Sequence, residues 1–196
     1  MSHYLEIGPG RGDFLFWLAK ENLTSQIYGV EYKKKRFDKL VNRLEKNGLL
    51  NIFLHSGDAR TVLPQEFSDG YFQKIFILFS DPWPKRRHQK HRLFQESFIR
   101  ELWRVLEPGG QIFIAHDDPN YLQEIRQLFE LFSEAFSYSS EGVQFMTFYA
   151  EKWIKEGRQL KSFSYRKKPN AILEKGCHLK RDYLALPCVL PAIEDS

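Results

Sequence analysis

A carboxylate, two prolines and a basic run stand together in the stretch DPWPKRRHQKHR, residues 81–92. It follows the apolar run KIFILFS, residues 74–80, which predicts a buried strand. Pro82 and Pro84 each fix one φ angle, so this loop should hold Asp81 with little freedom. A carboxylate at a strand tip can stabilise positive charge that develops on a substrate, and basic side chains bind phosphates. The stretch therefore predicts an immobilised acid beside a segment that binds a polyanion.

Acidic residues recur in or just after each of the predicted strands. They are Glu6, Glu31, Asp58, Asp81 and Asp117. In open parallel sheets, ligands bind outside the carboxyl ends of the strands, so these acids should line one crevice. The alternative is that they cap the helices that follow, which suits Asp117 and partly Asp58. It suits Glu6 badly, because Glu6 lies inside an apolar strand.

The glycine-rich turn GPGRG contains Gly8, Gly10 and Gly12, which allow the backbone to approach a ligand closely. The dinucleotide fingerprint GxGxxG would need a glycine at position 13, where this chain has Asp13. An acid there would repel a pyrophosphate from the helix N-terminus. Glu31 stands where an acid can hold both ribose hydroxyls. Together these residues favour S-adenosylmethionine, which carries cations and no phosphate, over a nicotinamide cofactor.

Strand and helix patterns alternate along the chain. Predicted strands occupy residues 4–7, 26–32, 51–56, 74–80 and 111–116, and two strand-like runs follow at about 144–149 and 160–165. Predicted helices occupy residues 13–21, about 37–47, 93–106 and 119–132, and EPGG at 107–110 is predicted to be a turn. This alternation predicts an α/β fold with a parallel sheet covered on both faces.

The chain has 196 residues and a pI of about 9.0, typical of one globular domain with a polyanion partner. We expect a catalytic domain over residues 1–166 and a tail of unknown role over 167–196. No apolar run is long enough for a membrane span, and the first residues do not resemble a secretory signal. Cys177 and Cys188 are expected to be reduced thiols of a cytoplasmic protein. Isolated histidines such as His3 predict no metal site.

Several motifs resemble the tRNA (guanine-N7-)-methyltransferase family: LEIGPGRG, GVEY, GDA, DPWPKRRHQKHR, HDDPNY and MTFYAEK. The resemblance covers residues 4 to about 165. It implies a Rossmann-like class I methyltransferase fold, with a seven-stranded, mostly parallel sheet and helices on both faces. It also implies transfer of a methyl group from S-adenosylmethionine to N7 of a guanine in the tRNA variable loop, at position 46.

The resemblance also implies roles for individual residues. The cofactor would be bound by Glu6, Gly8, Gly10, Glu31, Asp58, Ala59 and Asp81. Asp81 would also be the catalytic acid. The target nucleotide would be bound by Lys85, Asp117, Thr147 and Tyr149. RNA would be contacted by Arg87, His88, Gln89, Lys90, His91 and Arg92.

This chain departs from the family pattern in the target-base pocket. It has His116 before Asp117 where the family has Thr, and Ala150 where the family has Glu. We expect Asp117 and Thr147 to hold the guanine, rather than Glu151 in a bulged register.

Guanine N7 has a free lone pair and needs no general base, so in-line placement and charge stabilisation should suffice. Trp83 could stack on the purine or pack beneath the loop, and packing is favoured. One alternative function is methylation of an exocyclic amine, although those enzymes use Asp/Asn-Pro-Pro-aromatic at this place. Another is a non-catalytic RNA-binding subunit with the same fold. Monomer and homodimer both remain open.

Overall fold

The structure is a computed structural model that describes residues 1–83, 85–142, 155, 157 and 160–173. Its strands are β1 (His3–Ile7), β2 (Gln26–Glu31), β3 (Ile52–Ser56), β4 (Phe72–Leu78), β5 (Leu106–His116), β6 (Phe136–Ser139) and β7 (Lys161–Lys167). Its helices are α1 (Asp13–Glu21), α2 (Lys34–Asn47), α3 (Ala59–Glu66), α4 (Glu96–Val105) and α5 (Pro119–Glu130), with a short 3₁₀ helix, η1 (Arg86–His91).

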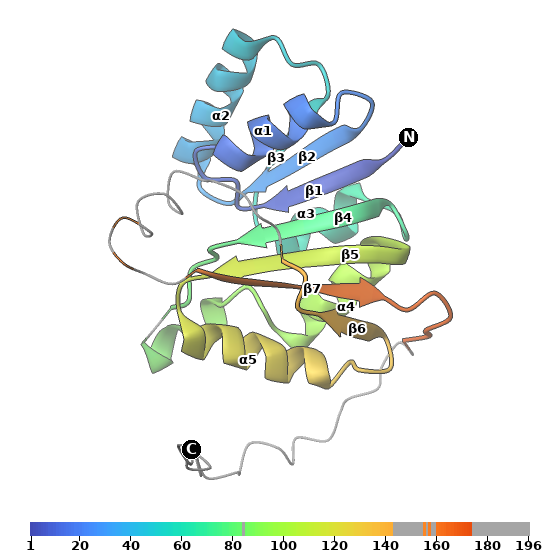
Figure 1. Ribbon diagram of the computed structural model, residues 1–196. Coiled ribbons are helices and arrows are strands. Elements are labelled where there is room, and N and C mark those ends of the chain that lie inside the picture. The colour runs from blue at the N-terminus through green and yellow to red at the C-terminus, as the bar shows by residue number, and fades with distance from the viewer. Residues whose placement is uncertain (84, 143–154, 156, 158–159, 174–196) are drawn as a thin grey trace.

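The strands form one seven-stranded sheet in the order β3-β2-β1-β4-β5-β7-β6 (Figure 1). Pairing is parallel from β3 to β5, whereas β7 runs antiparallel to both β5 and β6. The predicted α/β class and the mostly parallel sheet are therefore confirmed. The order reverses between β1 and β4, so the turns that follow these two strands lie together at one edge of the sheet.

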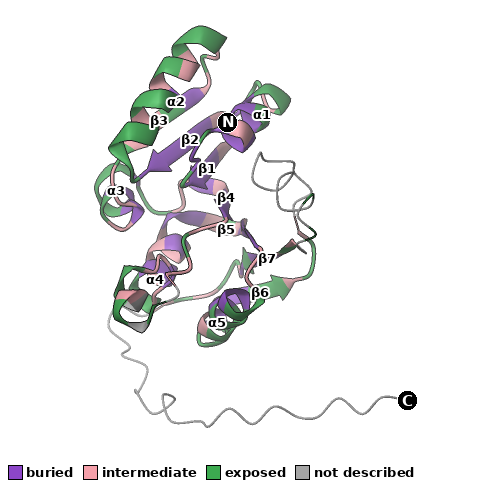
Figure 2. Ribbon diagram, turned by 90° about the vertical axis from the view of Figure 1, so that its left-hand side faces the viewer, coloured by how far each residue is buried: buried purple, intermediate pink, exposed green. Residues whose placement is uncertain are grey.

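Alternation along the strands divides the core into two layers. Leu5 and Ile7 of β1 pack into the cluster that includes α3, α4 and α5, whereas Tyr4 packs with α1 and α2. Glu6 has the same parity as Tyr4, so its side chain is directed to the α1 face. Figure 2 shows the buried residues gathered on the strands and on the helix surfaces that face them.

Gly12 shows why α1 begins where it does. Its φ of 83° is a left-handed conformation that glycine adopts without strain. A Cβ at this position would come within 2.5 Å of Leu40 on α2 and 3.0 Å of Phe16. The last glycine of GPGRG therefore allows α1 and α2 to pack closely behind the turn that carries Gly8 and Gly10.

The predicted strands and helices are confirmed for the parallel half of the sheet, but several details were wrong. Residues 107–110, predicted as a turn, lie inside β5, which has a register shift opposite residues 72–74. Asp118, rather than Asp117, caps α5, accepting from the amides of Asn120 and Tyr121. The predictions omitted α3 and β6. The expected strand at 144–149 lies outside the described residues.

The predicted domain boundary, between residues 166 and 167, falls within β7. β7 continues to Lys167, and Ala171 and Leu173 pack against the core beyond it. No helix within the described ranges is long and apolar enough to cross a membrane. Among the same residues, no group of three or more His, Cys, Asp or Glu could hold a metal ion.

Candidate functional site

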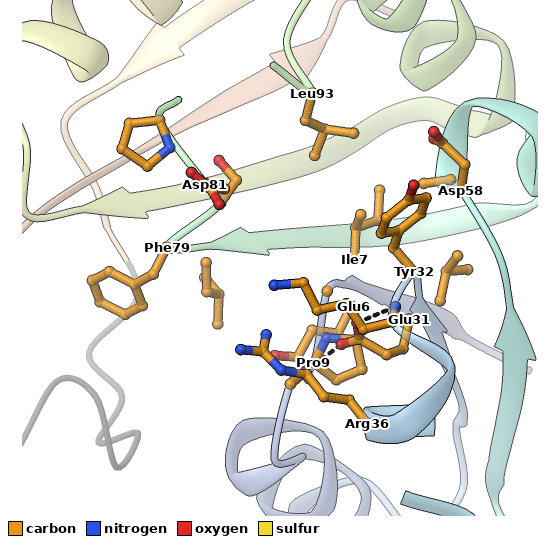
Figure 3. Close-up of a pocket in the computed structure, with 18 of the residues that line it drawn as sticks. Glu6, Ile7, Pro9, Glu31, Tyr32, Arg36, Asp58, Phe79, Asp81 and Leu93 are labelled. Atoms are coloured by element: carbon orange, nitrogen blue, oxygen red, sulfur yellow. Dashed lines mark hydrogen bonds between the residues drawn. The ribbon is translucent and has the colours of Figure 1, made fainter. Parts of the chain in front are cut away.

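The glycine turn after β1 is joined to the end of β2 by Glu31. The buried carboxylate accepts a hydrogen bond from the Gly10 amide at 3.0 Å and another from the Lys33 amide at 2.8 Å (Figure 3). Gly8 and Gly10 both have positive φ, at 74° and 59°. Glu31 therefore organises both turns at the carboxyl edge, and its remaining lone pairs stay available to a ligand.

Glu6 is a buried acid with an unpartnered oxygen. Its side chain is 3% exposed, and its Oε2 has no hydrogen-bond partner. Burial, with the nearby carboxylates of Asp13 and Glu31, raises the pKa of Glu6 from 4.5 to about 8. A protonated or newly ionised carboxyl here is suited to accept a cationic or hydrogen-bond-donating group from the pocket.

Asp58 caps α3 and is paired with Arg60. Its carboxylate accepts from the Arg60 amide at 2.9 Å and forms an ion pair with the Arg60 guanidinium at 2.5 Å. These hydrogen bonds lower the pKa of Asp58, so it stays ionised at neutral pH. The helix-capping alternative is confirmed for this residue, which also lines the pocket.

Asp81 lies in the loop after β4, between residues with unusual backbone conformation. Phe79 and Trp83 have φ of 55° and 42°, a region that non-glycine residues seldom adopt. The Asp81 side chain is exposed and accepts a hydrogen bond from the Trp83 amide at 3.1 Å. Strained backbone held by its surroundings is typical of functional sites. Asp81 is thus fixed with its charge open to solvent.

One cavity of about 1030 Å³ brings these acids together. In Figure 3, Glu6 and Glu31 lie close to each other, and Asp58 and Asp81 approach from the ends of other strands. The predicted cofactor residues all line this cavity: Glu6, Gly8, Gly10, Glu31, Asp58, Ala59 and Asp81.

Asp117, His88 and His91 also line it, which extends the cavity from the acids to η1. The basic stretch predicted to contact RNA forms this 3₁₀ helix. The exposed side chains of Lys85, Arg87 and Lys90 do not line the cavity. The side chain of Gln89, like Thr147 and Tyr149, lies outside the described part of the structure. The rings of His88 and His91 pack around Trp83, at centroid distances of 5.6 and 5.4 Å, and Trp83 itself lines the cavity.

Arg92 differs from the other basic residues of the stretch. Its side chain is only 14% exposed and forms an ion pair with Glu124 of α5. Its Nε donates to the Pro82 carbonyl at 2.7 Å. The structure therefore directs this guanidinium into the protein, whereas Lys85, Arg87 and Lys90 of the same run are exposed.

At the end of β5, His116 is buried and Asp117 lies on the cavity wall. The Asp117 carboxylate is 3.3 Å from Nδ1 of His116. His116 and Asp117, where the chain departs from the family pattern, are thus in contact.

Sequence reasoning missed several residues of the cavity wall, including Tyr32, Arg60, Phe79 and Leu93. Arg60 has the clearest signal, because it follows the capping acid Asp58 by two residues and can reach back to it. Phe79 has no such signal in the sequence. Its left-handed conformation accompanies a hydrogen bond from its amide to the Ala115 carbonyl of β5, and a phenylalanine does not indicate that conformation by its residue type.

Comparison with known proteins gives consistent matches. A family model described as "Putative methyltransferase" matches residues 1–163. The chain is 38% identical over 117 residues to a tRNA (guanine-N(7)-)-methyltransferase of Chlamydia trachomatis, covering 60% of this chain and 52% of that protein. It is 33% identical over 169 residues to the protein of the same name from Aquifex aeolicus, covering 83% and 56%.

The chain thus spans about half the length of the curated relatives that it matches. The fold is similar to that of a solved SAM dependent methyltransferase from Aquifex aeolicus, with a TM-score of 0.58 and 16% identity. That alignment covers 85% of this chain and 81% of the other. This similarity concerns the arrangement of the sheet and its helices.

Proposed function

The chain belongs to the methyltransferase family whose model it matches over residues 1–163, and from this premise we propose that it methylates N7 of a guanine in tRNA with S-adenosylmethionine as methyl donor. The curated relatives bear the name of this activity. We further propose the variable-loop guanine at position 46 as the target, and the cytoplasm as the compartment.

The observation that carries the proposal is the continuity of a single cavity. It is lined by the buried acids Glu6 and Glu31 and also by the exposed Asp81 and by His88 of η1. A cationic cofactor and a base attached to a phosphate backbone need these two environments, and they must meet where the methyl group is transferred.

The cavity suits S-adenosylmethionine in size and in chemistry. Its volume of about 1030 Å³ can take a ligand of this size. Glu31 can accept hydrogen bonds from ribose hydroxyls, and the unpartnered Oε2 of Glu6 can accept from a cationic group. Asp13 at the start of α1 also lines the cavity, and its carboxylate is paired with Arg43 at 2.7 Å.

Held by Glu6 and Glu31, S-adenosylmethionine would supply a methyl group on its sulfonium sulfur to the N7 lone pair of guanine, and the sulfur would keep the electron pair of the broken bond. The purine gains positive charge in this step and no proton is removed. Asp81 is exposed at the cavity, so its carboxylate stabilises that charge electrostatically. The hydrogen bond from the Trp83 amide keeps this carboxylate in place.

Recognition of the base rests on Asp117, with Thr147 and Tyr149 as further proposed contacts. A carboxylate can accept from both donors on the Watson–Crick edge of guanine, N1–H and the amine. Lys85 and the exposed residues of η1 would bind phosphates beside the target nucleotide.

Nucleoside mass spectrometry tests the proposal directly. The protein is incubated with S-adenosylmethionine and two tRNA transcripts that differ only in guanine or adenine at position 46. We expect 7-methylguanosine only in the first. A methylated exocyclic amine would instead support that alternative, and no methylation of either transcript or of bulk tRNA would leave a binding role.

A further inference from the structure

Asp81 stands between two backbone carbonyls that are each bound by a distant side chain. The carbonyl of Ser80, just before it, lies 2.8 Å from Nε2 of His116. The carbonyl of Pro82, just after it, accepts from Nε of Arg92 at 2.7 Å. The loop is thus tied on both sides of the acid, from β5 and from the end of the basic stretch.

The ring of His116 has three polar neighbours, because the Asp117 carboxylate lies 3.3 Å from Nδ1 and the Asp118 amide and the Ser80 carbonyl are also within reach. The Asp118 amide can only donate, so Nδ1, at 2.8 Å, accepts. The Ser80 carbonyl can only accept, so Nε2 carries the proton. His116 therefore links the ends of β4, β5 and α5 through one ring.

Arg92 is fixed in turn by α5. It pairs with Glu124, and its guanidinium lies 5.3 Å over the ring of Tyr121. The same tyrosine ring meets His116 edge-on at 5.2 Å. Tyr121 is buried, so it forms a common support for both ties.

We propose that Arg92 and His116 are positioning residues that hold the Asp81 carboxylate toward the reacting atoms, and that Arg92 acts through this loop rather than by binding RNA phosphates. The inference rests on the proposed methyl transfer. Its physical basis is that a small displacement of a reacting or charge-stabilising group lowers the rate of transfer without changing binding of the distant phosphate backbone.

Arg92→Lys separates the two roles, because lysine keeps the charge but lacks the rigid fork that reaches Pro82 and Glu124 together. We expect kcat to fall by about tenfold or more, with KM for tRNA and the salt dependence of tRNA binding unchanged. Arg126→Lys is the matched control: Arg126 is exposed on α5 beside Tyr138, and this variant should behave as the wild type.

The variants His116→Asn and His116→Gln test separately the two hydrogen bonds of the imidazole, to the Ser80 carbonyl and from the Asp118 amide. The Asn oxygen can replace Nδ1 and accept from the Asp118 amide, but its side chain is too short to reach the Ser80 carbonyl. The longer Gln amide can donate to Ser80. We expect Asn to lower kcat more than Gln, with thermal melting confirming that both variants fold.

Hydrogen exchange of the cofactor-free protein gives a readout that does not depend on activity. In Arg92→Lys, amides of residues 79–92 should exchange faster than in the wild type, and those of β1 and α1 should not. Unchanged exchange and unchanged kcat would overturn the proposal. A raised KM with a flatter salt dependence and normal kcat would also overturn it, and would make Arg92 an RNA contact. If the wild type methylates nothing, the proposed function fails, but the exchange result still decides whether Arg92 holds the loop.

Discussion

The Glu31 carboxylate accepts a hydrogen bond from the Gly10 amide at 3.0 Å, across 21 residues of sequence. Its other oxygen accepts from Lys33. One buried acid therefore sets the geometry of the glycine turn and offers acceptors to a ligand. Removing this carboxylate should therefore both disturb the glycine turn and take away hydrogen-bond acceptors for the cofactor.

We predict that Glu31→Ala weakens S-adenosylmethionine binding about tenfold or more, because charge-assisted hydrogen bonds contribute roughly 1.5–3 kcal/mol. Calorimetric titration measures this. Glu31→Gln keeps an acceptor for one amide but loses the charge, so it should be intermediate. Unchanged affinity in both variants would exclude Glu31 from the binding site.

The raised pKa of Glu6 predicts that stability depends on pH. Between pH 4.5 and about 8, the folded protein holds a proton on Glu6 that the unfolded chain has released. The folded state then binds more protons, so this group makes stability fall as pH rises through that range. Glu6→Gln should remove this decline. Urea unfolding at pH 5 and pH 9 should show the variant gaining relative to the wild type only at the higher pH.

Binding of a cationic cofactor should release the Glu6 proton, because a nearby positive charge favours the ionised carboxylate. Calorimetry at pH 7 in buffers of different ionisation enthalpy should therefore show proton release, and affinity should rise between pH 6 and 8. Glu6→Gln serves as the control, since it has no proton to release. Equal proton release from this variant would assign the effect to another group.

Asp81 should act mainly on turnover. Asp81→Asn keeps an oxygen for the Trp83 amide but removes the charge, whereas Asp81→Ala removes both. We predict that kcat falls about 10²-fold in each, the order observed when one preorganised electrostatic group is lost. Steady-state kinetics with tRNA measure it. If Asn retains activity within a few-fold while Ala does not, the hydrogen bond matters and the charge does not.

The exposed part of the basic stretch should determine the salt dependence of tRNA binding. Each phosphate contact contributes roughly 0.7–0.9 to the slope of log K against log salt, so replacing the exposed Lys85, Arg87 and Lys90 by alanine should flatten it by about 2. S-adenosylmethionine affinity should stay constant. A slope identical to that of the wild type would show that these side chains are only solvated.

The sequence predicted the site where strand periodicity and residue type suffice. Apolar runs located the strands, and acids in or just after those strands pointed to one cavity, as Glu6 and Asp58 show. Arg92 could not be distinguished in this way, because a run of cations gives no sign of which one turns inward. Its orientation depends on Glu124 and Tyr121, which meet it only when α5 packs beside the loop.

Dependence on a distant segment also explains why β6 could not be predicted from the sequence. Its four residues have little apolar periodicity, and the strand exists because it pairs with β7, whose sequence comes later. His116 departs from the family pattern, but the sequence does not predict its hydrogen bond to the Ser80 carbonyl, because that bond requires β4 and β5 to be neighbours.

The antiparallel insertion of β7 between β5 and β6 constrains the order of events during synthesis. Gln111 pairs with Arg166, so the outer edge of β5 has no sheet partner until the ribosome has released residues up to about 167. β6 emerges earlier but must wait for the same strand. The nascent chain therefore carries an open strand edge, a template for wrong pairing, until β7 arrives.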